Sequence, residues 1–385
     1  MTRLILTGGG TGGHIYPALA IAEGVRRRWP DAEILYVGAK NGMESRIVTD
    51  AGYPFRGITA EGWQGRKIFS LTGALRADYK GSREAADIYA EWQPQALIGT
   101  GGYVCLPAAL AAYRKRIPIY IHEQNAFPGM TNRLVSYWAR RVMLSFEEAA
   151  DRFPASCRKR TALTGLPVRE SLAGASKSEA AAFFQLHEGR KTILATGGSQ
   201  GAERINRAMV EAIGSFAGRQ DVQVVFATGR RDFPKIREEL AALGICGEDN
   251  NKEAGNVRVY PYIDRMDLAY AAADLYVGRA GASTLAEITL CRLPAILIPY
   301  PHASENHQTY NASSLADQGG AVLLEDRTLS GPALAKALEG LLDDDGRRLA
   351  MAECSGKAAF GRALEDILDI VAEVMGDERK GSASG

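Results

Sequence analysis

The feature that most constrains the fold is an alternation of short apolar runs with helical patterns, a series that begins twice along the chain. Such runs are typical of strands that are buried on both faces of a parallel sheet. Strands separated by helices and short loops indicate a doubly wound α/β fold, here occurring twice. The predicted strands are residues 4–7, 34–37, 96–98, 117–122 and 142–144, and then 192–196, 222–227, 257–260, 275–278 and 295–299.

The length of 385 residues favours two domains rather than one core. A Gly-x-Pro turn in LTGLPVRESL (163–172) separates the two series, so we predict domains of residues 1–165 and 166–356. An amphipathic C-terminal helix at about 357–375 could pack back on the first domain. Residues 376–385 are expected to form a disordered tail.

Charge is unevenly distributed, although the net charge is only +1. Residues 1–165 hold 22 Lys and Arg against 14 Asp and Glu, whereas the remainder holds 24 against 31. A positive first half suggests an anionic partner, and solvated helix faces are the alternative. The five Cys form no CxxC pair and the five His no HxxxH or HExxH motif. We therefore expect a reduced, cytosolic chain without a metal site.

No membrane-spanning or secretory segment is expected. The N-terminus enters a predicted strand almost at once and lacks the apolar region of a signal peptide. The uncharged stretch 96–113 contains three glycines and a proline and divides into strand, turn and helix, unlike a transmembrane helix.

Three glycine-rich loops each follow a predicted strand and precede a helix. The first, GGGTGG at residues 8–13, formally matches the G-x-G-x-x-G dinucleotide motif. A dinucleotide site would add an acid at the end of the second strand, but Val37, Gly38, Ala39 and Lys40 stand there. This argues against NAD, and only Lys40 leaves NADP open.

The other two loops lie in IGTGGYVCLPAALAAY (98–113) and ILATGGSQGAERIN (193–206). Amides at a helix N-terminus can hold a phosphate without a metal, and the Ser199 hydroxyl could assist. Three such loops over two sheets suggest two phosphate-bearing ligands that meet in a cleft. Structural tight turns are the alternative for each loop.

Four stretches carry a more specific resemblance: GGGTGGHIYPALAIA, GTGGYVCLPAALAAYRKRIPIYIHEQNAFPGMTNR, TGGSQGAERIN and GRAGASTLAEITLCRLPAILIPYPHASENHQTYNA. In this order and spacing the chain resembles the MurG family of bacterial glycosyltransferases, over about residues 3–375. The resemblance implies a GT-B fold, two Rossmann-like domains facing a cleft. It implies transfer of GlcNAc, with inversion, from UDP-GlcNAc bound by the C-terminal domain. The implied acceptor is undecaprenyl-pyrophosphoryl-MurNAc-pentapeptide on the N-terminal domain.

The resemblance also implies roles for individual residues. Asn125 would contact the GlcNAc hydroxyls, Ile263 would line the uracil pocket and Gln308 would reach the sugar. Arg169 and Ser199 would lie near the nucleotide and its phosphates. The remaining implied donor residues are Thr11, Gly12 and Gly13 of the first loop, and Ala282, Ser283, Thr284, Leu285, Ala286 and Glu287, which would wrap the nucleotide. The acceptor and phosphate loops would include Gly10, Gly101, Gly102 and Tyr103.

Some positions depart from the family pattern. Leu166 and Cys105 stand where Asn and Ser are usual, Ala280 and Ser283 alter the SGALT segment, and His307 replaces the first Gln of a pair. These departures affect fine contacts rather than the reaction.

His14 is the candidate catalytic base. The acceptor C4 hydroxyl must lose a proton as it attacks, and a neutral imidazole suits that task. The helix start is expected to keep His14 neutral through nearby amides and the dipole. A His that only binds phosphate or caps the helix is the alternative. His122 and Glu123 could instead position the acceptor or tie the HEQN loop.

Glu287 follows a glycine turn, and in the first turn of a helix it could accept bonds from both ribose hydroxyls. Compensation of the helix dipole is its alternative role. Arg169 and Arg279 could offset pyrophosphate charge or form ion pairs. No Asp-x-Asp metal clamp ends a strand, and LLDDDG (341–346) is typical of a polar helix-end turn. Departure of UDP would then rely on helix N-termini and Ser199, without a metal or other cofactor, with UDP-GlcNAc as substrate.

Basic residues in the first half suit docking to an anionic membrane surface. Trp63, Ile68, Phe69, Leu71 and Leu75 lie among Arg66, Lys67 and Arg76, and six more basic residues are Arg114, Lys115, Arg116, Arg133, Arg140 and Arg141. The alternative is that Leu71 and Leu75 belong to the core. No nucleic-acid recognition module is visible.

The sequence therefore predicts a UDP-GlcNAc-dependent hexosyltransferase of peptidoglycan synthesis, peripheral on the cytoplasmic face of the bacterial cell membrane. The alternatives are another GT-B enzyme, such as a diacylglycerol glucosyltransferase or a UDP-GlcNAc 2-epimerase, and a non-catalytic sugar-nucleotide sensor. An NAD(P) oxidoreductase is a more distant reading.

Overall fold

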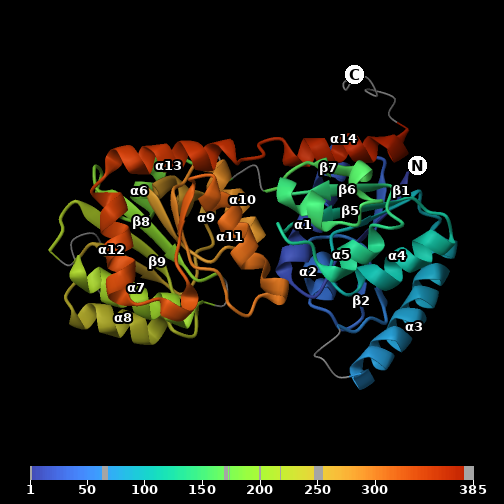
Figure 1. Ribbon diagram of the computed structural model, residues 1–385, viewed down its shortest axis with the longest axis horizontal. Coiled ribbons are helices and arrows are strands. Elements are labelled where there is room, and N and C mark those ends of the chain that lie inside the picture. The colour runs from blue at the N-terminus through green and yellow to red at the C-terminus, as the bar shows by residue number, and fades with distance from the viewer. Residues whose placement is uncertain are drawn as a thin grey trace. The chain divides into compact units, whose positions relative to one another are not determined.

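The computed structural model describes residues 2–62, 68–168, 172, 174–198, 201–216, 218–246 and 255–376. The chain forms two compact units, Met1–Val168 with Arg362–Gly385, and Arg169–Gly361 (Figure 1). The sequence places the domain boundary after residue 165, and the division observed here follows Val168. The predicted tail lies, beyond Gly376, outside the described residues.

A parallel sheet of seven strands forms the first unit, in the order β3-β2-β1-β4-β5-β6-β7. The central strand β1 pairs with β2 and β4, so that Leu6 lies between Tyr36 and Ile98. Because helices cover both faces of this sheet, its strands are buried on both faces, which explains their uninterrupted apolar sequences. The bounds are β1 Arg3–Thr7, β2 Glu33–Ala39, β3 Phe55–Ile58, β4 Ala96–Gly99, β5 Ile119–Glu123, β6 Arg141–Leu144 and β7 Thr161–Leu163.

Helices cover both faces of this sheet. On one face, Ile21 of α1 and Val371 of α14 share a core with Leu6. On the other face, α3, α4 and α5 pack over a core that includes Ile5 and Ala108. The C-terminal helix α14 begins later than the predicted start near residue 357. The bounds are α1 Gly12–Arg28, α2 Glu44–Asp50, α3 Ile68–Trp92, α4 Cys105–Arg114, α5 Met130–Val135 and α14 Ala363–Met375, with 3-10 turns at Glu147–Arg152 and Arg158–Arg160.

The second unit repeats the design with a six-stranded parallel sheet in the order β10-β9-β8-β11-β12-β13. Its strands are β8 Lys191–Thr196, β9 Val222–Ala227, β10 Val257–Tyr260, β11 Leu275–Gly278, β12 Ala295–Leu297 and β13 Ala321–Leu323. The two parallel α/β sheets confirm the predicted fold class.

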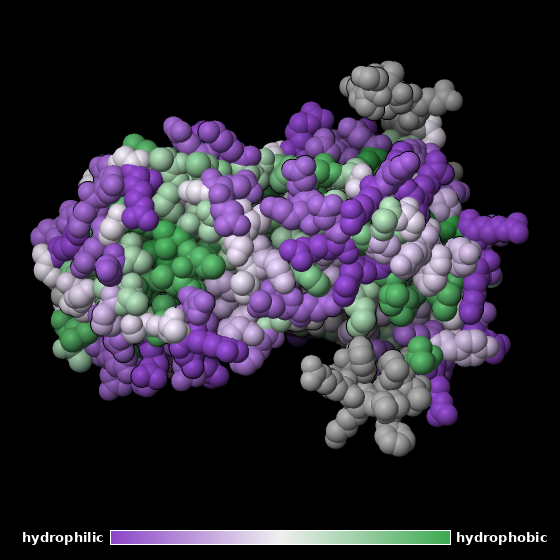
Figure 2. All heavy atoms as spheres, in the orientation of Figure 1, coloured by the Kyte–Doolittle hydropathy of each residue, from purple (hydrophilic) through white to green (hydrophobic). Residues whose placement is uncertain are grey.

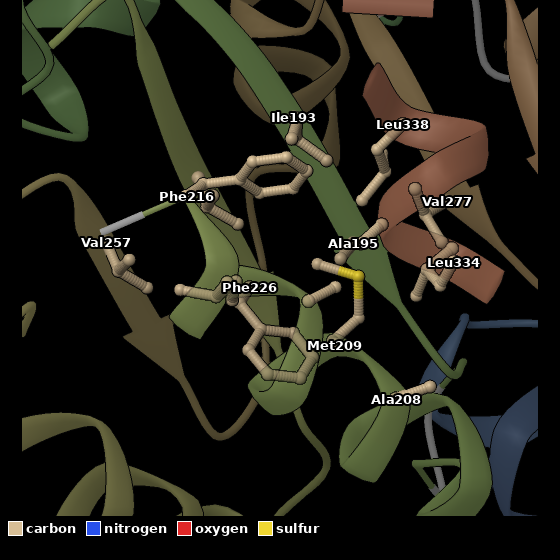
Figure 3. Packing of buried hydrophobic residues seen from close by; sticks show 14 of the residues in the cluster. Ile193, Ala195, Ala208, Met209, Phe216, Phe226, Val257, Val277, Leu334 and Leu338 are labelled. Carbon is tan, nitrogen blue, oxygen red and sulfur yellow. The ribbon is translucent and has the colours of Figure 1, made fainter. Parts of the chain in front are cut away.

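One face of this sheet carries the largest core of the second unit. Figure 3 shows Met209 of α7 and Leu338 of α12 packed against Ile193 of β8 and Phe226 of β9. The helices of the unit are α6 Lys177–Phe183, α7 Glu203–Ser215, α8 Phe233–Ala242, α9 Met266–Ala272, α10 Ala282–Leu290, α11 His307–Asp317, α12 Gly331–Leu342 and α13 Asp345–Lys357, with 3-10 turns at Ser304–Asn306 and Asp326–Thr328.

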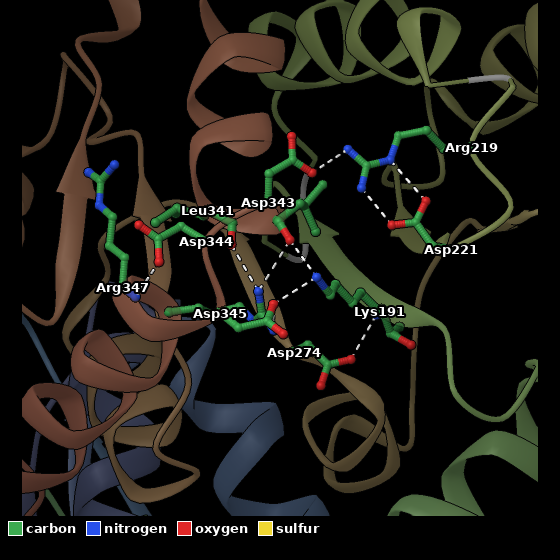
Figure 4. A network of polar contacts seen from close by, with 12 residues as sticks. Lys191, Arg219, Asp221, Asp274, Leu341, Asp343, Asp344, Asp345 and Arg347 are labelled. Atoms are coloured by element: carbon green, nitrogen blue, oxygen red, sulfur yellow. Dashed lines mark hydrogen bonds and ion pairs between the residues drawn. The ribbon is translucent and has the colours of Figure 1, made fainter.

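A polar network ties the turn between α12 and α13 to the amino end of β8 (Figure 4). Lys191 Nζ donates to the Leu342 carbonyl at 2.5 Å and pairs with Asp345 at 2.8 Å. Asp344 caps α13 by accepting the Arg347 amide at 2.8 Å. The LLDDDG segment is thus a polar helix-end turn, as its sequence predicts, and it lies at the sheet edge opposite the glycine loops.

Candidate active site

Each sheet has one point at which the strand order reverses, between β1 and β4 in the first unit and between β8 and β11 in the second. In open α/β sheets, ligands bind at the carboxyl ends of the strands beside such a point. The loops found there are 8–11 and 100–104 in the first unit and 197–202 and 279–281 in the second. All three glycine-rich loops of the sequence therefore lie at switch points.

The two glycine loops of the first unit are in direct backbone contact. The Gly9 amide donates to the Gly101 carbonyl at 3.2 Å. Gly10 has a φ of +82°, and the Tyr103 ring covers it so closely that a Cβ there would lie 2.9 Å from Cε1. The buried Cys105 thiol donates to the Thr7 and Gly101 carbonyls at 3.3 and 3.1 Å, and burial raises its pKa to about 12.

The N-terminus of α1 faces the carboxyl edge of this sheet. The amides of His14 and Ile15 donate to the Thr11 carbonyl at 3.1 and 3.2 Å. The amides of Gly12 and Gly13 precede these first intrahelical bonds, so neither has an acceptor within the helix. Thr11 and Gly13 are exposed. Open amides at a helix start suit an anionic group such as a phosphate.

A buried carboxylate that the sequence did not reveal supports this loop. Glu44, at the start of α2, accepts the Ala39 amide at 2.9 Å and the Gly10 amide at 3.4 Å, and it is fully buried. A Cβ on Gly9 or Gly42 would lie within 2.4 Å of its carboxylate, so small residues surround it. Lys40, the candidate NADP contact, instead pairs with Glu84 at 2.8 Å. The only sequence signal for this carboxylate was the nearby glycines.

His14 is half-buried and held from three sides. Thr100 Oγ1 donates to its carbonyl oxygen at 2.7 Å, and its Nδ1 lies 3.1 Å from Gln124 Oε1. A Cβ on Gly101 would lie 3.0 Å from His14 Nδ1, so the ring packs against that glycine. The pKa of His14 is lowered, chiefly by burial, against the hydrogen bonds with Gln124 and Thr100. The sequence predicted a neutral His14 for another reason, the helix amides and dipole.

The HEQN segment spans the end of β5 and the start of the loop after it, which adds a third loop to this edge. Glu123 is buried and accepts the amides of Asn125 and Gly129 at 3.0 and 3.2 Å. It also accepts Asn132 Nδ2 at 2.8 Å and Asn125 Nδ2 at 3.3 Å. Burial raises the pKa of Glu123, and these donors act against that rise. Glu123 therefore shapes the loop that presents Asn125, and His122, also fully buried, lies beneath it.

In the second unit, the first glycine loop connects β8 to α7. The Gly198 amide donates to Thr196 Oγ1 at 3.1 Å, and Gly198 and Gly201 have φ of +86° and +76°. A Cβ on Gly201 would lie 2.5 Å from the Thr228 carbonyl oxygen, so the loop also approaches β9 closely. Two of the implied donor residues, Arg169 and Ser199, lie outside the described residues.

The predicted place of Glu287 in the first turn of its helix is wrong. Helix α10 begins at Ala282, so Glu287 lies in its second turn, where neither first-turn geometry nor dipole compensation applies. The carboxylate is half-buried and accepts Tyr270 Oη at 2.7 Å. Burial raises the pKa of Tyr270, and the Glu287 charge adds to the rise. Tyr270 thus fixes one carboxylate oxygen, while Ala282, Ser283, Thr284 and Ala286 are half-buried and Leu285 is buried.

Other implied donor residues lie on neighbouring loops at the same edge. Ile263 follows β10 and is buried. Gln308, in the first turn of α11, accepts the Tyr300 amide through Oε1 at 2.9 Å. Arg279 donates to the nearly buried Asp326 at 2.6 Å and to the carbonyls of Ile298 and Pro299, the two residues after β12, at 3.0 and 3.1 Å. Of its two expected roles, the structure shows the ion pair.

The described residues contain neither a cluster of metal-ligating side chains nor a helix that could span a membrane. In that part of the chain, no group of three or more His, Cys, Asp or Glu is placed to hold a metal ion. Among the helices described here, none is both long and apolar enough to cross a bilayer.

Comparison with known proteins places these loops in a family. Residues 4–144 match the glycosyltransferase family 28 N-terminal domain, and residues 192–367 match the glycosyltransferase family 28 C-terminal domain. A protein of Desulforamulus reducens is 45% identical over 97% of this chain and 99% of its own length. A Bacillus subtilis protein is 38% identical with the same coverage. Both are named UDP-N-acetylglucosamine--N-acetylmuramyl-(pentapeptide) pyrophosphoryl-undecaprenol N-acetylglucosamine transferase. The chain belongs to the MurG family of glycosyltransferases.

Solved structures agree with this assignment. MurG of Acinetobacter baumannii is 27% identical, with a TM-score of 0.78 over 97% of this chain and 100% of the other. The fold is therefore GT-B. A UDP complex of S. aureus MnaA has a TM-score of 0.67 over 98% of this chain and 97% of its own, but only 12% identity, so that likeness concerns the fold alone.

Proposed function

We propose that the chain transfers GlcNAc from UDP-GlcNAc to undecaprenyl-pyrophosphoryl-MurNAc-pentapeptide, the step that completes lipid II in peptidoglycan synthesis. The observation that carries this proposal is the full-length match, at 45% identity, to a protein named for that reaction. The enzyme is thus a UDP-GlcNAc-dependent hexosyltransferase. The first unit takes the lipid-linked acceptor and the second unit takes UDP-GlcNAc.

His14 serves as the general base of this transfer. Its Nε2 takes the proton from the acceptor C4 hydroxyl, whose oxygen attacks C1 of GlcNAc opposite UDP. The bond between C1 and the β-phosphate oxygen breaks as the new β-1,4 bond forms, and UDP leaves with the bonding electrons. The support for this role is a half-buried imidazole with a lowered pKa beside the open amides of α1. A neutral imidazole of this kind contributes about 10²–10⁴ in rate.

The nucleotide binds at the carboxyl edge of the second sheet. Glu287 accepts the ribose hydroxyls, and its bond from Tyr270 supports this role by orienting the carboxylate. The amides after β8 hold the diphosphate at the start of α7. Asn125, on the loop that Glu123 shapes, and Gln308 read the GlcNAc hydroxyls. Ile263 lines the uracil pocket. No residue role proposed here requires a metal.

The enzyme docks on the cytoplasmic face of the cell membrane through a docking patch on α3, α4 and α5. These helices pack side by side, and Figure 2 shows hydrophobic side chains among hydrophilic ones over this region. The patch comprises the exposed apolar residues Leu75, Tyr79, Tyr113, Met130, Leu134 and Tyr137 with the exposed basic residues Arg76, Lys80, Arg83, Arg114, Lys115 and Arg116. Apolar groups ringed by cations suit an anionic lipid surface.

Some residues that were predicted to dock on the membrane are not part of the docking patch. Leu75 is 59% exposed, so its alternative reading as a core residue is wrong. Arg140 and Arg141 pair with Glu373 of α14 at 3.0 and 3.2 Å, on the sheet face opposite α3 to α5, and so they leave the patch. Trp63, Arg66 and Lys67, and the side chains of Ile68, Phe69 and Leu71, lie outside the described residues.

Radiolabelled UDP-GlcNAc, incubated with the full chain and a lipid-linked MurNAc-pentapeptide analogue, tests the proposed reaction. Label in a disaccharide lipid, lost when the acceptor is omitted, supports it. Three results would overturn it: label in a diacylglycerol glycoside when radiolabelled UDP-glucose and diacylglycerol replace the two substrates, release of free ManNAc, or binding of UDP-GlcNAc without turnover. They correspond to a lipid glucosyltransferase, an epimerase and a sensor.

A further inference from the structure

The ring of His14 ends a buried chain of hydrogen bonds that passes through two residues of the HEQN segment. Gln124 Oε1 lies 3.1 Å from His14 Nδ1, and Gln124 Nε2 lies 3.1 Å from His122 Nδ1. His122 Nε2 lies 2.9 Å from the Gly165 carbonyl oxygen. His122 is 0% and Gln124 2% exposed, so water is excluded as an alternative partner. Each atom in the chain must therefore act as either a donor or an acceptor.

The direction of the chain is set at Gly165. A carbonyl oxygen only accepts, so His122 Nε2 carries the proton of that bond. Burial lowers the pKa of His122 to about 4, and the ring is therefore neutral at physiological pH. A neutral imidazole with a proton on Nε2 has a lone pair on Nδ1. His122 consequently presents an acceptor to Gln124.

The orientation of the Gln124 amide follows. Its Nε2 lies between two acceptors, His122 Nδ1 at 3.1 Å and the His122 carbonyl oxygen at 3.0 Å. An NH₂ group satisfies both, whereas a reversed amide would place Oε1 against two lone pairs and leave a buried amide unsatisfied. Gln124 Oε1 therefore faces His14, and because this oxygen only accepts, His14 Nδ1 must donate.

We propose that Gln124 is a positioning residue that holds His14 in the Nδ1–H tautomer, with the lone pair on Nε2. The inference rests on the proposed function only in naming Nε2 as the atom that takes the acceptor proton. The tautomer with the proton on Nε2 has no lone pair there and cannot act as that base. His122 and Gly165 act indirectly, because they fix the orientation of the Gln124 amide rather than that of the His14 ring.

The tautomer can be read directly, without activity. Full-length protein with ¹⁵N in its histidine rings gives separate shifts for protonated and unprotonated nitrogens, and a His14→Gln variant identifies the His14 signals among the five histidines. We expect a protonated Nδ1 and an unprotonated Nε2 in the wild type. In Gln124→Met, His14 should populate both tautomers and interconvert between them, so that its two ring nitrogens no longer show one protonated and one unprotonated shift. Gln318→Met, at the exposed residue that follows α11, is the matched control and should leave the signals unchanged.

Steady-state kinetics give the second readout. Gln124→Met should lower kcat about 100-fold while changing the KM for UDP-GlcNAc little, since positioning a general base affects the chemical step. Gln124→Glu keeps an oxygen acceptor for His14 Nδ1–H, but its second oxygen cannot donate to His122 Nδ1 or to the His122 carbonyl oxygen, so it should recover only part of kcat. Its negative charge also favours the protonated imidazole, so the acid limb of the kcat profile should move to higher pH.

Two results would overturn the proposal: an Nε2–H tautomer of His14 in the wild type, or the same His14 signals in Gln124→Met as in the wild type. The wild-type chain could make no disaccharide lipid and still show an Nδ1–H tautomer of His14 that depends on Gln124. This result would refute the proposed function but support the positioning role of Gln124.

Discussion

The carbonyl oxygen of Gly9 occupies the space where a side chain on Gly102 would begin, because a Cβ there would lie only 2.1 Å from it. Gly102 also has a φ of +82°, which L residues rarely adopt. The loops after β1 and β4 can therefore meet only as bare backbone. This close approach brings the start of α1 and the loop around Tyr103 to one place.

Replacing this glycine should destabilise the fold. We expect Gly102→Ala to lower the free energy of unfolding in urea by about 3 kcal/mol or more, since backbone must move and φ is unfavourable. Gly52→Ala is the matched control, because Gly52 has a φ of +78° but nothing within 4 Å of its Cβ position. It should cost about 1–2 kcal/mol. If Gly102→Ala and Gly52→Ala lower the free energy of unfolding equally, the loops after β1 and β4 separate easily.

Arg279 should matter for stability rather than for binding the nucleotide. Its ion pair with Asp326 spans 2.6 Å, with side chains 14% and 5% exposed. Arg279→Met leaves a buried carboxylate with only a 3.5 Å contact to Arg204, and should cost about 3 kcal/mol in urea unfolding. Arg231→Met, whose pair with Asp232 is on a 73% exposed side chain, should lower the free energy of unfolding far less, because solvent screens an exposed pair. A raised KM for UDP-GlcNAc at unchanged stability would instead place Arg279 at the pyrophosphate.

Ten strands could be predicted from the sequence because each is a short apolar run, and the three missed strands show the limit of that signal. In β3, β7 and β13 the burial alternates or fades, as in FRGI, TAL and AVL. These are edge or near-edge strands of three or four residues, and neighbours rather than their own sequences make them strands. The expected place of Glu287 in the first turn was wrong for a different reason, because no Ser, Thr, Asp or Asn precedes Ala282 to mark the start of α10.

The polar interior of the site was less predictable than the loops that frame it. The HEQN motif indicated a functional loop, but the partners of its side chains are distant in sequence. Gln124 contacts His14 across 110 positions and His122 contacts Gly165 across 43. Glu44 supports a loop 34 residues earlier. Periodicity and spacing in the sequence indicate local structure. These contacts join distant segments, which meet only when the carboxyl ends of the parallel strands lie side by side.

Glu287 should recognise the ribose through its charge. Loss of a charge-assisted hydrogen bond costs about 1.5–3 kcal/mol, so Glu287→Gln should weaken UDP binding by roughly tenfold or more in calorimetry. Wild-type protein should bind UDP more tightly than 2′-deoxy-UDP, and the variant should lose most of that difference. Tyr270→Phe, which removes only the 2.7 Å bond to the carboxylate, should have a smaller effect. If Glu287→Gln discriminates between UDP and 2′-deoxy-UDP as well as the wild type does, Glu287 does not bind the ribose.

Exposed basic residues of the docking patch should control membrane binding. Replacing Arg114, Lys115 and Arg116 with Gln should weaken sedimentation with vesicles of anionic phospholipid by at least about tenfold at low salt, and the difference should shrink as salt screens the surface. Arg140→Gln with Arg141→Gln is the control, since these residues pair with Glu373. Equal loss in both variants would point to net charge rather than to this patch.

The lowered pKa of His14 predicts how transfer depends on pH. Only the neutral ring can take the acceptor proton, so kcat falls as pH drops through the pKa of His14. An ordinary His, with a pKa of 6.5, would be half protonated at pH 6.5. Because burial lowers the pKa of His14, kcat should fall less between pH 7.5 and 6.5 than it would with an ordinary His, and the acid limb should lie at lower pH. His14→Ala should reduce kcat about 100-fold or more, with a smaller change in donor KM, and should abolish this limb. His187→Asn, in the second unit, should leave the profile intact. An acid limb at or above pH 7, or a limb that survives in His14→Ala, would assign the base to another group.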